Sequence, residues 1–192
     1  AVELSVSEAI NRNFKCAFEP VRKYQLSLPF PSGLGVDWSN FGGPREIFII
    51  NSILDDWPLI LSEIQPDLKP LVRQGAICMF LWGLKLGGEL RKKLASNGTH
   101  LGPDDVCRMM LFFAQNKFRI FDAKSKSEEL GMPYIMKILR FEGDFCSACK
   151  KHRVGDYSLS EVPEIPLADC RCKGGCTISL SEALDINKVT TI

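Results

Sequence analysis

Five of the chain's eight cysteines lie in its last quarter, and their spacing is the feature of the sequence best suited to chemistry. They follow the pattern C-x2-C, then twenty intervening residues, then C-x-C-x3-C. Two thiolates two residues apart project from one tight turn and share a tetrahedral zinc ion at about 2.3 Å, and a second pair completes its coordination. The sequence therefore predicts a zinc site built from four of these five cysteines: Cys146, Cys149, Cys170, Cys172 and Cys176.

The second ligand pair has two alternatives. Cys172 and Cys176 flank Lys-Gly-Gly, whose glycines permit the positive backbone angles of a metal-binding turn. Cys170 and Cys172 form the competing pair, and either choice leaves one cysteine over. His152 follows Cys149 by three residues and is a further alternative ligand, although we interpret it as a solvated member of the run KKHR.

Zinc explains these cysteines better than disulfides do. A chain of 192 residues is long enough to bury a core without covalent cross-links. The cluster has an odd number of cysteines, and Cys16, Cys78 and Cys107 stand alone in apolar helical surroundings where free thiols are commonly buried. This pattern favours a reducing compartment, the cytoplasm. Four protein ligands leave no open position for water, so we expect a structural site.

Residues for acid–base or phosphate chemistry are sparse elsewhere. The chain has two histidines, and His100 lies in a polar loop. Adjacent carboxylates such as Asp104 and Asp105 point in different directions on a helix. The sequence has no Gly-rich phosphate-binding loop and no nucleophile elbow. We therefore name no catalytic residue, and an enzyme is the less favoured interpretation.

Net charge does not select a partner. The formal charge is +1, so the protein has no global field that attracts nucleic acid or an anionic membrane. The most apolar run, residues 76–84, is shorter than the ~20 residues that cross a bilayer, and the first ten residues do not resemble a secretory signal.

A nucleic-acid site remains the alternative, because basic residues surround the predicted zinc turns: Lys150, Lys151, Arg153, Arg171 and Lys173. Acidic residues in the same segment offset them.

Apolar periodicity predicts a mainly α-helical body. A first helix is expected over residues 5–18, ended by Pro20. Residues 20–44 are rich in Pro and Gly and are interleaved with Phe30, Trp38 and Phe41, so we expect an ordered loop that docks on the core. A ligand-binding role for residues 26–44 is the alternative. Further helices are expected from Gly43-Pro44, over residues 67–95 and over residues 103–121. For residues 67–95, a break after Lys85 is the main alternative.

The polar segment 122–132 separates this body from the cysteine region. It contains Gly131, and we interpret it as a boundary loop. Alternating apolar residues then predict a strand over residues 135–141 that enters the cysteine region. The expected fold is mainly α, with a helical body at residues 1–131 and a small C-terminal β-containing, zinc-stabilised module at residues 132–192.

The stretch from Cys146 to Cys172 resembles the cysteine-containing tail of head-morphogenesis proteins of tailed bacteriophages. The matching positions are Cys146, Cys149, Gly155, Pro163, Pro166, Cys170, Arg171 and Cys172. The family's usual His-Pro-Asn is here Leu167-Ala168-Asp169. The resemblance implies a phage or bacterial protein with a helical body, a cysteine tail and a role in assembly.

Together these features predict a non-enzymatic protein-interaction or assembly protein with a structural zinc site. Another protein is the expected partner, nucleic acid is the alternative partner, and no membrane association is expected.

Overall fold

The computed structural model describes residues 1–29, 37–83, 85–140, 145–151, 155–176, 178–186 and 188. Helices make up most of its regular structure, and one small sheet lies near the C-terminal end, so the prediction of a mainly α fold is confirmed. The elements in chain order are α1 (Val2–Ile10), α2 (Phe14–Ser27), α3 (Pro44–Asp55), η1 (Leu59–Leu61), η2 (Pro66–Leu68), α4 (Lys69–Trp82), α5 (Gly88–Lys93), α6 (Pro103–Leu130), β1 (Tyr134–Arg140), α7 (Ser147–Lys151), β2 (Gly155–Ser158) and β3 (Ile178–Leu184).

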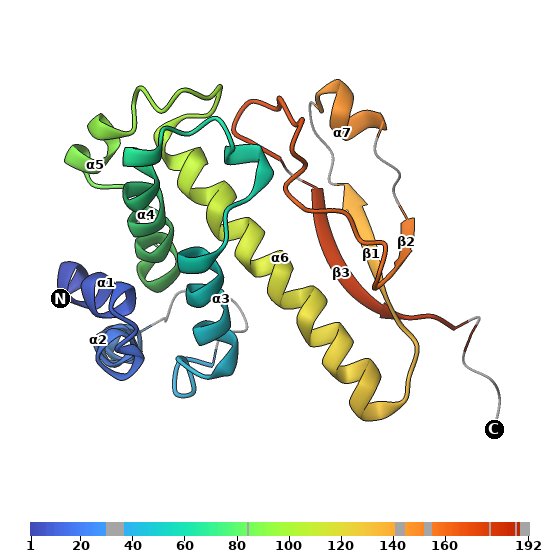
Figure 1. Ribbon diagram of the computed structural model, residues 1–192. Helices are drawn as coiled ribbons and strands as arrows, with labels where there is room; N and C mark the ends of the chain where they lie inside the picture. Colours follow the sequence, from blue (N-terminus) through green and yellow to red (C-terminus); the bar gives the residue numbers. More distant parts are fainter. Residues whose placement is uncertain are drawn as a thin grey trace.

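Helix α6 joins the two parts of the molecule. Pro103 occupies its first position and two aspartates lie in its first turn, where they complement the helix dipole. At 1.5 Å per residue its 28 residues extend for about 42 Å. It contacts α3 and α4 on one side and β1 and β3 on the other, so the helical body and the sheet share it (Figure 1).

The C-terminal third of α6 corrects the sequence interpretation. We predicted a helix end near residue 121 and a boundary loop over residues 122–132, but the helix continues through Leu130, and Gly131 ends it in the left-handed conformation, with φ 63°. Lys126 explains the difference, since its ammonium pairs with Asp122 one turn earlier and with Glu182 of β3, each at 2.7 Å. Ala123 is fully buried. Tertiary contacts therefore stabilise a polar segment as helix.

The N-terminal prediction was also wrong. Residues 5–18 do not form one helix ended by Pro20; α1 ends at Ile10, Arg12 adopts φ 59°, and Pro20 lies inside α2. A proline removes the hydrogen bond to the carbonyl four residues earlier, which here belongs to the exposed Cys16. Burial of Phe18 and Val21 keeps the helix on the core despite this loss.

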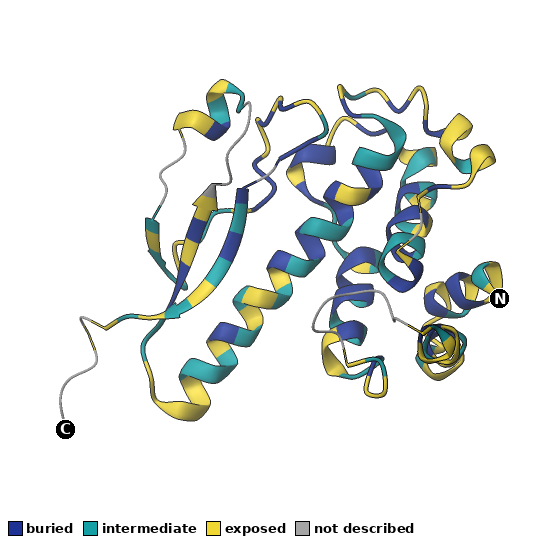
Figure 2. Cartoon of the chain, turned by 180° about the vertical axis from the view of Figure 1, so that it is seen from behind, coloured by how far each residue is buried: buried dark blue, intermediate teal, exposed yellow. Residues whose placement is uncertain are grey.

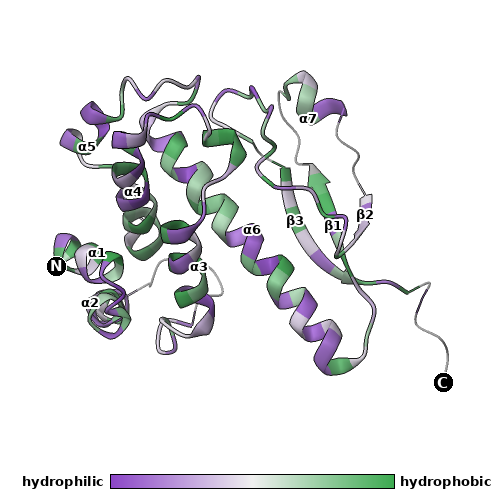
Figure 3. Cartoon of the chain, in the orientation of Figure 1, coloured by the Kyte–Doolittle hydropathy of each residue, from purple (hydrophilic) through white to green (hydrophobic). Residues whose placement is uncertain are grey.

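The segment 67–95 contains two helices, with the break at Gly83. Helix α4 ends there because Gly83 adopts the left-handed conformation, two residues before the break that the sequence offered as an alternative. The short basic helix α5 follows and is mostly exposed (Figure 2) and hydrophilic (Figure 3). The helix predicted to open at Gly43-Pro44 is confirmed as α3.

The Pro/Gly-rich segment docks on the core where the structure describes it. Trp38 and Phe41 lie with ring centroids 4.8 Å apart, and Phe41 contacts Phe18 at 5.6 Å. Phe41 is buried, as expected for a docking aromatic. The N-terminal part of the segment belongs to α2, and residues 30–36, including Phe30, lie outside the described residues.

The sheet is antiparallel, with strand order β2-β1-β3. The predicted strand at residues 135–141 corresponds to β1, which lies at the centre, while residue 141 itself lies outside the described residues. Ile138 pairs with Leu180 and Met136 with Glu182, so these residues share one face of the sheet. Met136, Ile138 and Leu180 are buried and belong to the same hydrophobic core as the helices. The predicted division at residues 131 and 132 stays a prediction, while the core runs across it.

Candidate metal centre

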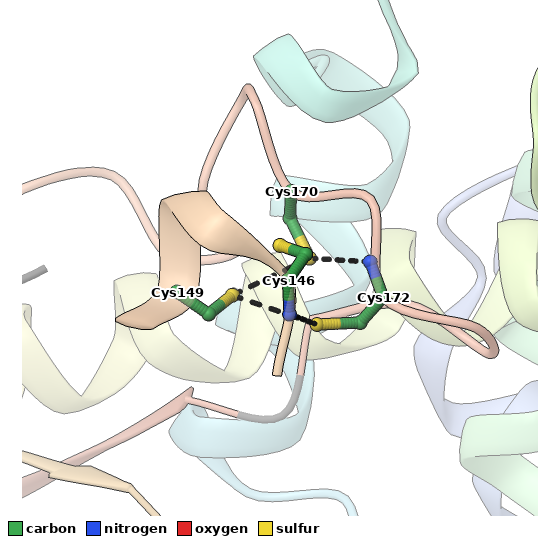
Figure 4. Close-up of side chains that lie close together, drawn as sticks. All are labelled: Cys146, Cys149, Cys170 and Cys172. Carbon is green, nitrogen blue, oxygen red and sulfur yellow. Dashed lines mark hydrogen bonds between the residues drawn. The ribbon is translucent and has the colours of Figure 1, made fainter. Parts of the chain in front are cut away.

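Strand pairing brings the two cysteine segments together. Arg140, at the end of β1, pairs with Ile178, at the start of β3. The end of β1 and the start of β3 therefore lie beside each other at one end of the sheet. Cys146 lies just before α7 and Cys149 inside it, while Cys170 and Cys172 lie in the loop before β3. Figure 4 shows the four side chains directed toward a common centre.

The sulfur atoms have the spacing of a tetrahedral metal site. All four lie within 4.8 Å of one another. Cys149 and Cys170 are 3.5 Å apart, Cys149 and Cys172 3.8 Å, and Cys146 and Cys170 4.0 Å. Four sulfurs at about 2.3 Å from a central ion define a tetrahedron with edges of about 3.8 Å. The cysteines of the cluster are free thiols, since a disulfide requires about 2.05 Å between sulfurs.

Backbone amides support negative charge on the sulfurs. The N–H of Arg171 donates to the Cys146 sulfur at 3.2 Å, and the N–H of Cys146 donates to the Cys172 sulfur at 3.2 Å. The N–H of Cys172 donates to the Cys170 sulfur at 3.4 Å. Such bonds stabilise the thiolate form, which is the form that binds a metal. Cys149, Cys170 and Cys172 are buried, and Cys146 is half-buried.

The thiols differ in how readily they release a proton. Burial raises the pKa of Cys146, but hydrogen bonds from the backbone of Arg171 and from neighbouring thiols outweigh it and lower the pKa to about 6. Burial, followed by the charge of Cys176, raises the pKa of Cys149. A hydrogen bond with Cys176 and then burial raise the pKa of Cys170. The cluster without a metal therefore keeps protons that a bound metal would displace.

Cys176 lies beside this group but does not belong to it. Its hydrogen bond with Cys170 lowers its pKa to about 6 against the opposing effect of burial. The group of four sulfurs within 4.8 Å contains Cys170 and Cys172, the competing pair of the sequence interpretation, rather than Cys172 and Cys176. The chain brings together four of the five predicted cysteines, and which of them bind a metal stays a prediction.

The Lys-Gly-Gly turn contacts α6 instead of enclosing a metal. Gly174 and Gly175 have φ angles of 81° and 93°, so the predicted positive backbone angles are present. A Cβ on Gly175 would lie 2.6 Å from the sulfur of Met109, and the N–H of Cys176 donates to that sulfur at 3.2 Å. Arg108 donates to the carbonyl of Gly174. The glycines therefore allow the turn to pack closely on α6.

This support by α6 is what the sequence interpretation missed. Met109 is buried, and the apolar pattern of its segment indicated only a core position. Arg108 also pairs with Asp105 at 2.5 Å, one turn earlier. Sequence spacing carries no signal for a contact between residues about 65 positions apart, so only the fold reveals it.

The remaining predicted residues lie at or outside the edge of the site. Lys150, Lys151 and Lys173 are exposed, and the Arg171 guanidinium lies 3.9 Å from Glu63. His152 and Arg153 lie outside the described residues.

The isolated cysteines divide into three cases: Cys107 is buried as predicted, Cys78 is half-buried, and Cys16 is exposed. The prediction of a buried thiol was therefore wrong for Cys16, which faces away from the core on α2.

Comparison with known proteins yields no relative: no family model, no curated protein and no solved structure matches the chain. The resemblance to head-morphogenesis proteins thus stays a prediction. Among the described helices, none combines the length and apolar character needed to span a bilayer. The site itself has the geometry of a four-cysteine metal centre.

Proposed function

We propose that Cys146, Cys149, Cys170 and Cys172 bind one structural zinc ion, and that the protein is a non-enzymatic interaction or assembly protein working in a reducing compartment. The sulfur–sulfur separations of 3.5–4.0 Å are the observation that carries the proposal. Four thiolate ligands in a tetrahedral arrangement are typical of zinc, with iron the competing metal. A complete protein ligand shell leaves no position at which zinc activates water.

The ion would supply stability in two segments that contain little regular secondary structure. Where the structure describes them, the two segments that carry the cysteines contain one five-residue helix and otherwise turns and loops. Ile165 and Leu167 pack into the main core, and a structural zinc ion would add to this packing by joining the two segments directly. The ordered loop presents a rigid surface beside α6. Such a rigid surface favours binding of another protein.

Nucleic-acid binding is the second candidate. Lys150, Lys151 and Lys173 are exposed around the four cysteines, and a zinc-ordered module would present them to phosphates. Arg171 is less available, because Glu63 lies beside it. Retention on DNA that falls steeply with salt would favour this candidate over protein binding, and retention unaffected by the change of Lys150, Lys151 and Lys173 to alanine would contradict it.

Metal content tests the zinc site directly. Protein purified without chelator is analysed by native mass spectrometry as the wild type, Cys149→Ser and Cys16→Ser. We expect about one zinc per chain in the wild type, loss of zinc in Cys149→Ser, and retention in Cys16→Ser, the matched control at an exposed thiol far along the chain. Iron would contradict the identity of the metal. A wild type with no metal, or a Cys149→Ser variant that keeps it, would contradict the site.

A further inference from the structure

A cleft lies between α1, α4 and α5 in the helical body, on the side of the molecule opposite the sheet (Figure 1). This cleft, which we term the α5 cleft, has a volume of about 560 Å³, within the range of small-ligand sites. Its apolar walls come from Val2 and Val6 of α1, Leu71 and Cys78 of α4, and Leu90 of α5. It shares no residue with the metal centre.

The apolar walls of the α5 cleft continue the main hydrophobic core. Val6 is buried, and Val2, Leu71 and Leu90 are partly buried against the core. Burial raises the pKa of the half-buried Cys78 thiol, so this group stays protonated at neutral pH and behaves as a small apolar side chain. The walls therefore favour contact with an alkyl group, because a charged group placed against them would lose its hydration without gaining a partner.

Gly87 and Gly88 line the cleft and leave space that their own backbone does not require. Gly87 has φ −62° and ψ 154°, which any residue adopts, and Gly88 is not among the glycines with positive φ. A Cβ added at either position would meet no described atom within 4 Å. Gly88 is also the first residue of α5, where glycine is less favourable than alanine. Glycines that neither conformation nor packing requires allow a ligand to approach the backbone closely.

Two lysines at the cleft are available to an anion. Lys85 and Lys93 line the cleft and are exposed, and neither has an ion-pair partner among the described residues. The other charged residues that line it are Glu3 and Glu89. Glu89 pairs with Lys92 at 3.0 Å, and Glu3 lies in the first turn of α1, where the helix dipole complements its charge. An anion in the cleft would therefore gain two cations, whereas a cation would be repelled by them.

From these features we infer that the α5 cleft binds a free amphiphilic anion with one unbranched alkyl chain, such as a medium-chain carboxylate. The alkyl chain lies against the apolar walls and passes close to the backbone of Gly87 and Gly88. The anionic group pairs with Lys85 and Lys93. An anionic membrane presents the same two kinds of group, but its alkyl chains are held in the bilayer, so the ligand is the free molecule. This binding site is separate from the proposed interaction role and does not depend on the metal centre.

Protection of Cys78 from alkylation measures occupancy of the cleft. The protein, purified without chelator, is treated with N-ethylmaleimide at increasing concentrations of octanoate, and peptide mass spectrometry follows Cys78 and the exposed Cys16 separately. We expect octanoate to slow alkylation of Cys78, with a dissociation constant on the order of 1 mM, and to leave the rate at Cys16 unchanged. Each added CH2 group should tighten binding about fourfold, so decanoate should bind about fifteenfold more tightly than octanoate, and hexanoate about fifteenfold more weakly.

A double lysine variant tests recognition of the anionic group. Changing Lys85 and Lys93 together to glutamine should weaken octanoate binding by about three- to tenfold and leave binding of the uncharged 1-octanol unchanged. The matched control changes Lys15 and Lys124 to glutamine, because these exposed lysines do not line the cleft and the net charge changes equally. The control should bind octanoate as the wild type does.

Gly88→Leu tests the space beside the glycines. The variant should fold with a melting temperature near that of the wild type, because an added Cβ at this position meets no described atom within 4 Å. Its side chain should occupy the cleft and weaken binding of both octanoate and 1-octanol by at least about tenfold. This result differs from that of the double lysine variant, which affects only the charged probe.

Four results would overturn the inference: no protection of Cys78 by monomeric octanoate or decanoate, equal protection by octylammonium, unchanged binding in both the double lysine variant and Gly88→Leu, or protection by anionic phosphatidylglycerol vesicles without protection by octanoate. Metal content is measured on the same samples. A zinc-containing protein that binds no octanoate contradicts the cleft alone, while octanoate binding to a protein that never contains metal contradicts the metal centre alone.

Discussion

The two sides of α6 are stabilised by different means. On the helical side, packing is distributed over many fully buried aliphatic residues, among them Ile49, Ile50, Ile53, Ile77 and Leu81. On the other side, the loop before β3 buries Ile165 and Leu167 in the same core, but it also takes part in a group of four sulfurs within 4.8 Å of one another and makes a few contacts with α6. Distributed packing loses stability gradually with each substitution, whereas a coordination site is lost when one ligand is removed. This difference is testable in both directions.

Removal of the metal should have the largest effect and should be confined to one side. Structural zinc contributes about 10–16 kcal/mol of apparent binding free energy in zinc-finger peptides, so its loss should open the cysteine segments entirely. In hydrogen exchange with and without chelator, we expect amides of residues 145–151 and 165–176 to lose protection while amides of α4 keep it. Equal loss of protection in α4 would mean that the two sides unfold as one unit.

A cavity in the helical core should have the opposite pattern. Ile50 is fully buried on α3, and Ile50→Ala should lower the free energy of unfolding in urea by about 2–5 kcal/mol. Metal content should remain at the wild-type level, because no ligand is changed. Ile10→Ala, at a position that is 41% exposed, is the matched control and should change stability by less than about 0.5 kcal/mol. Loss of metal in the Ile50 variant would contradict the separation of the two sides.

Acid should weaken the metal centre much more than the helical core. The pKa values of Cys149 and Cys170 are raised, so both thiols carry protons at neutral pH that metal binding must release. Affinity should therefore increase with pH, by at least about 100-fold per unit from these two protons. Cys146 has a pKa of about 6 and adds a further proton only below that pH, where the dependence should steepen. Competition with a chromophoric chelator across this range measures the slope, and an affinity independent of pH would contradict these proton assignments.

The same contrast explains what the sequence could predict. The spacing of Cys146 and Cys149 is local, so it indicated a metal-binding turn without knowledge of the fold. The choice between Cys170 and Cys176 depends on where α6 lies, because Met109 contacts the turn that contains Cys176. Local signals also failed where packing decides the structure, as in the helix around Pro20 and the polar end of α6.

Gly175→Ala should have the smallest of these effects and should act on the boundary between the two sides. Gly175 has φ 93°, and an added Cβ would lie 2.6 Å from the Met109 sulfur, so both backbone strain and overpacking oppose the substitution. We expect a loss of roughly 1–3 kcal/mol in the free energy of unfolding, with metal still bound because all four sulfurs remain. Gly88→Ala at the start of α5 is the matched control, since an added Cβ there meets no described atom within 4 Å, and it should change stability by less than about 0.5 kcal/mol. If Gly175→Ala releases the metal while Ile50→Ala does not, contact with α6 is required to position the cysteines, and the metal centre depends on the fold around it. If the metal stays bound, the four sulfurs are ordered by the ion and by strand pairing alone.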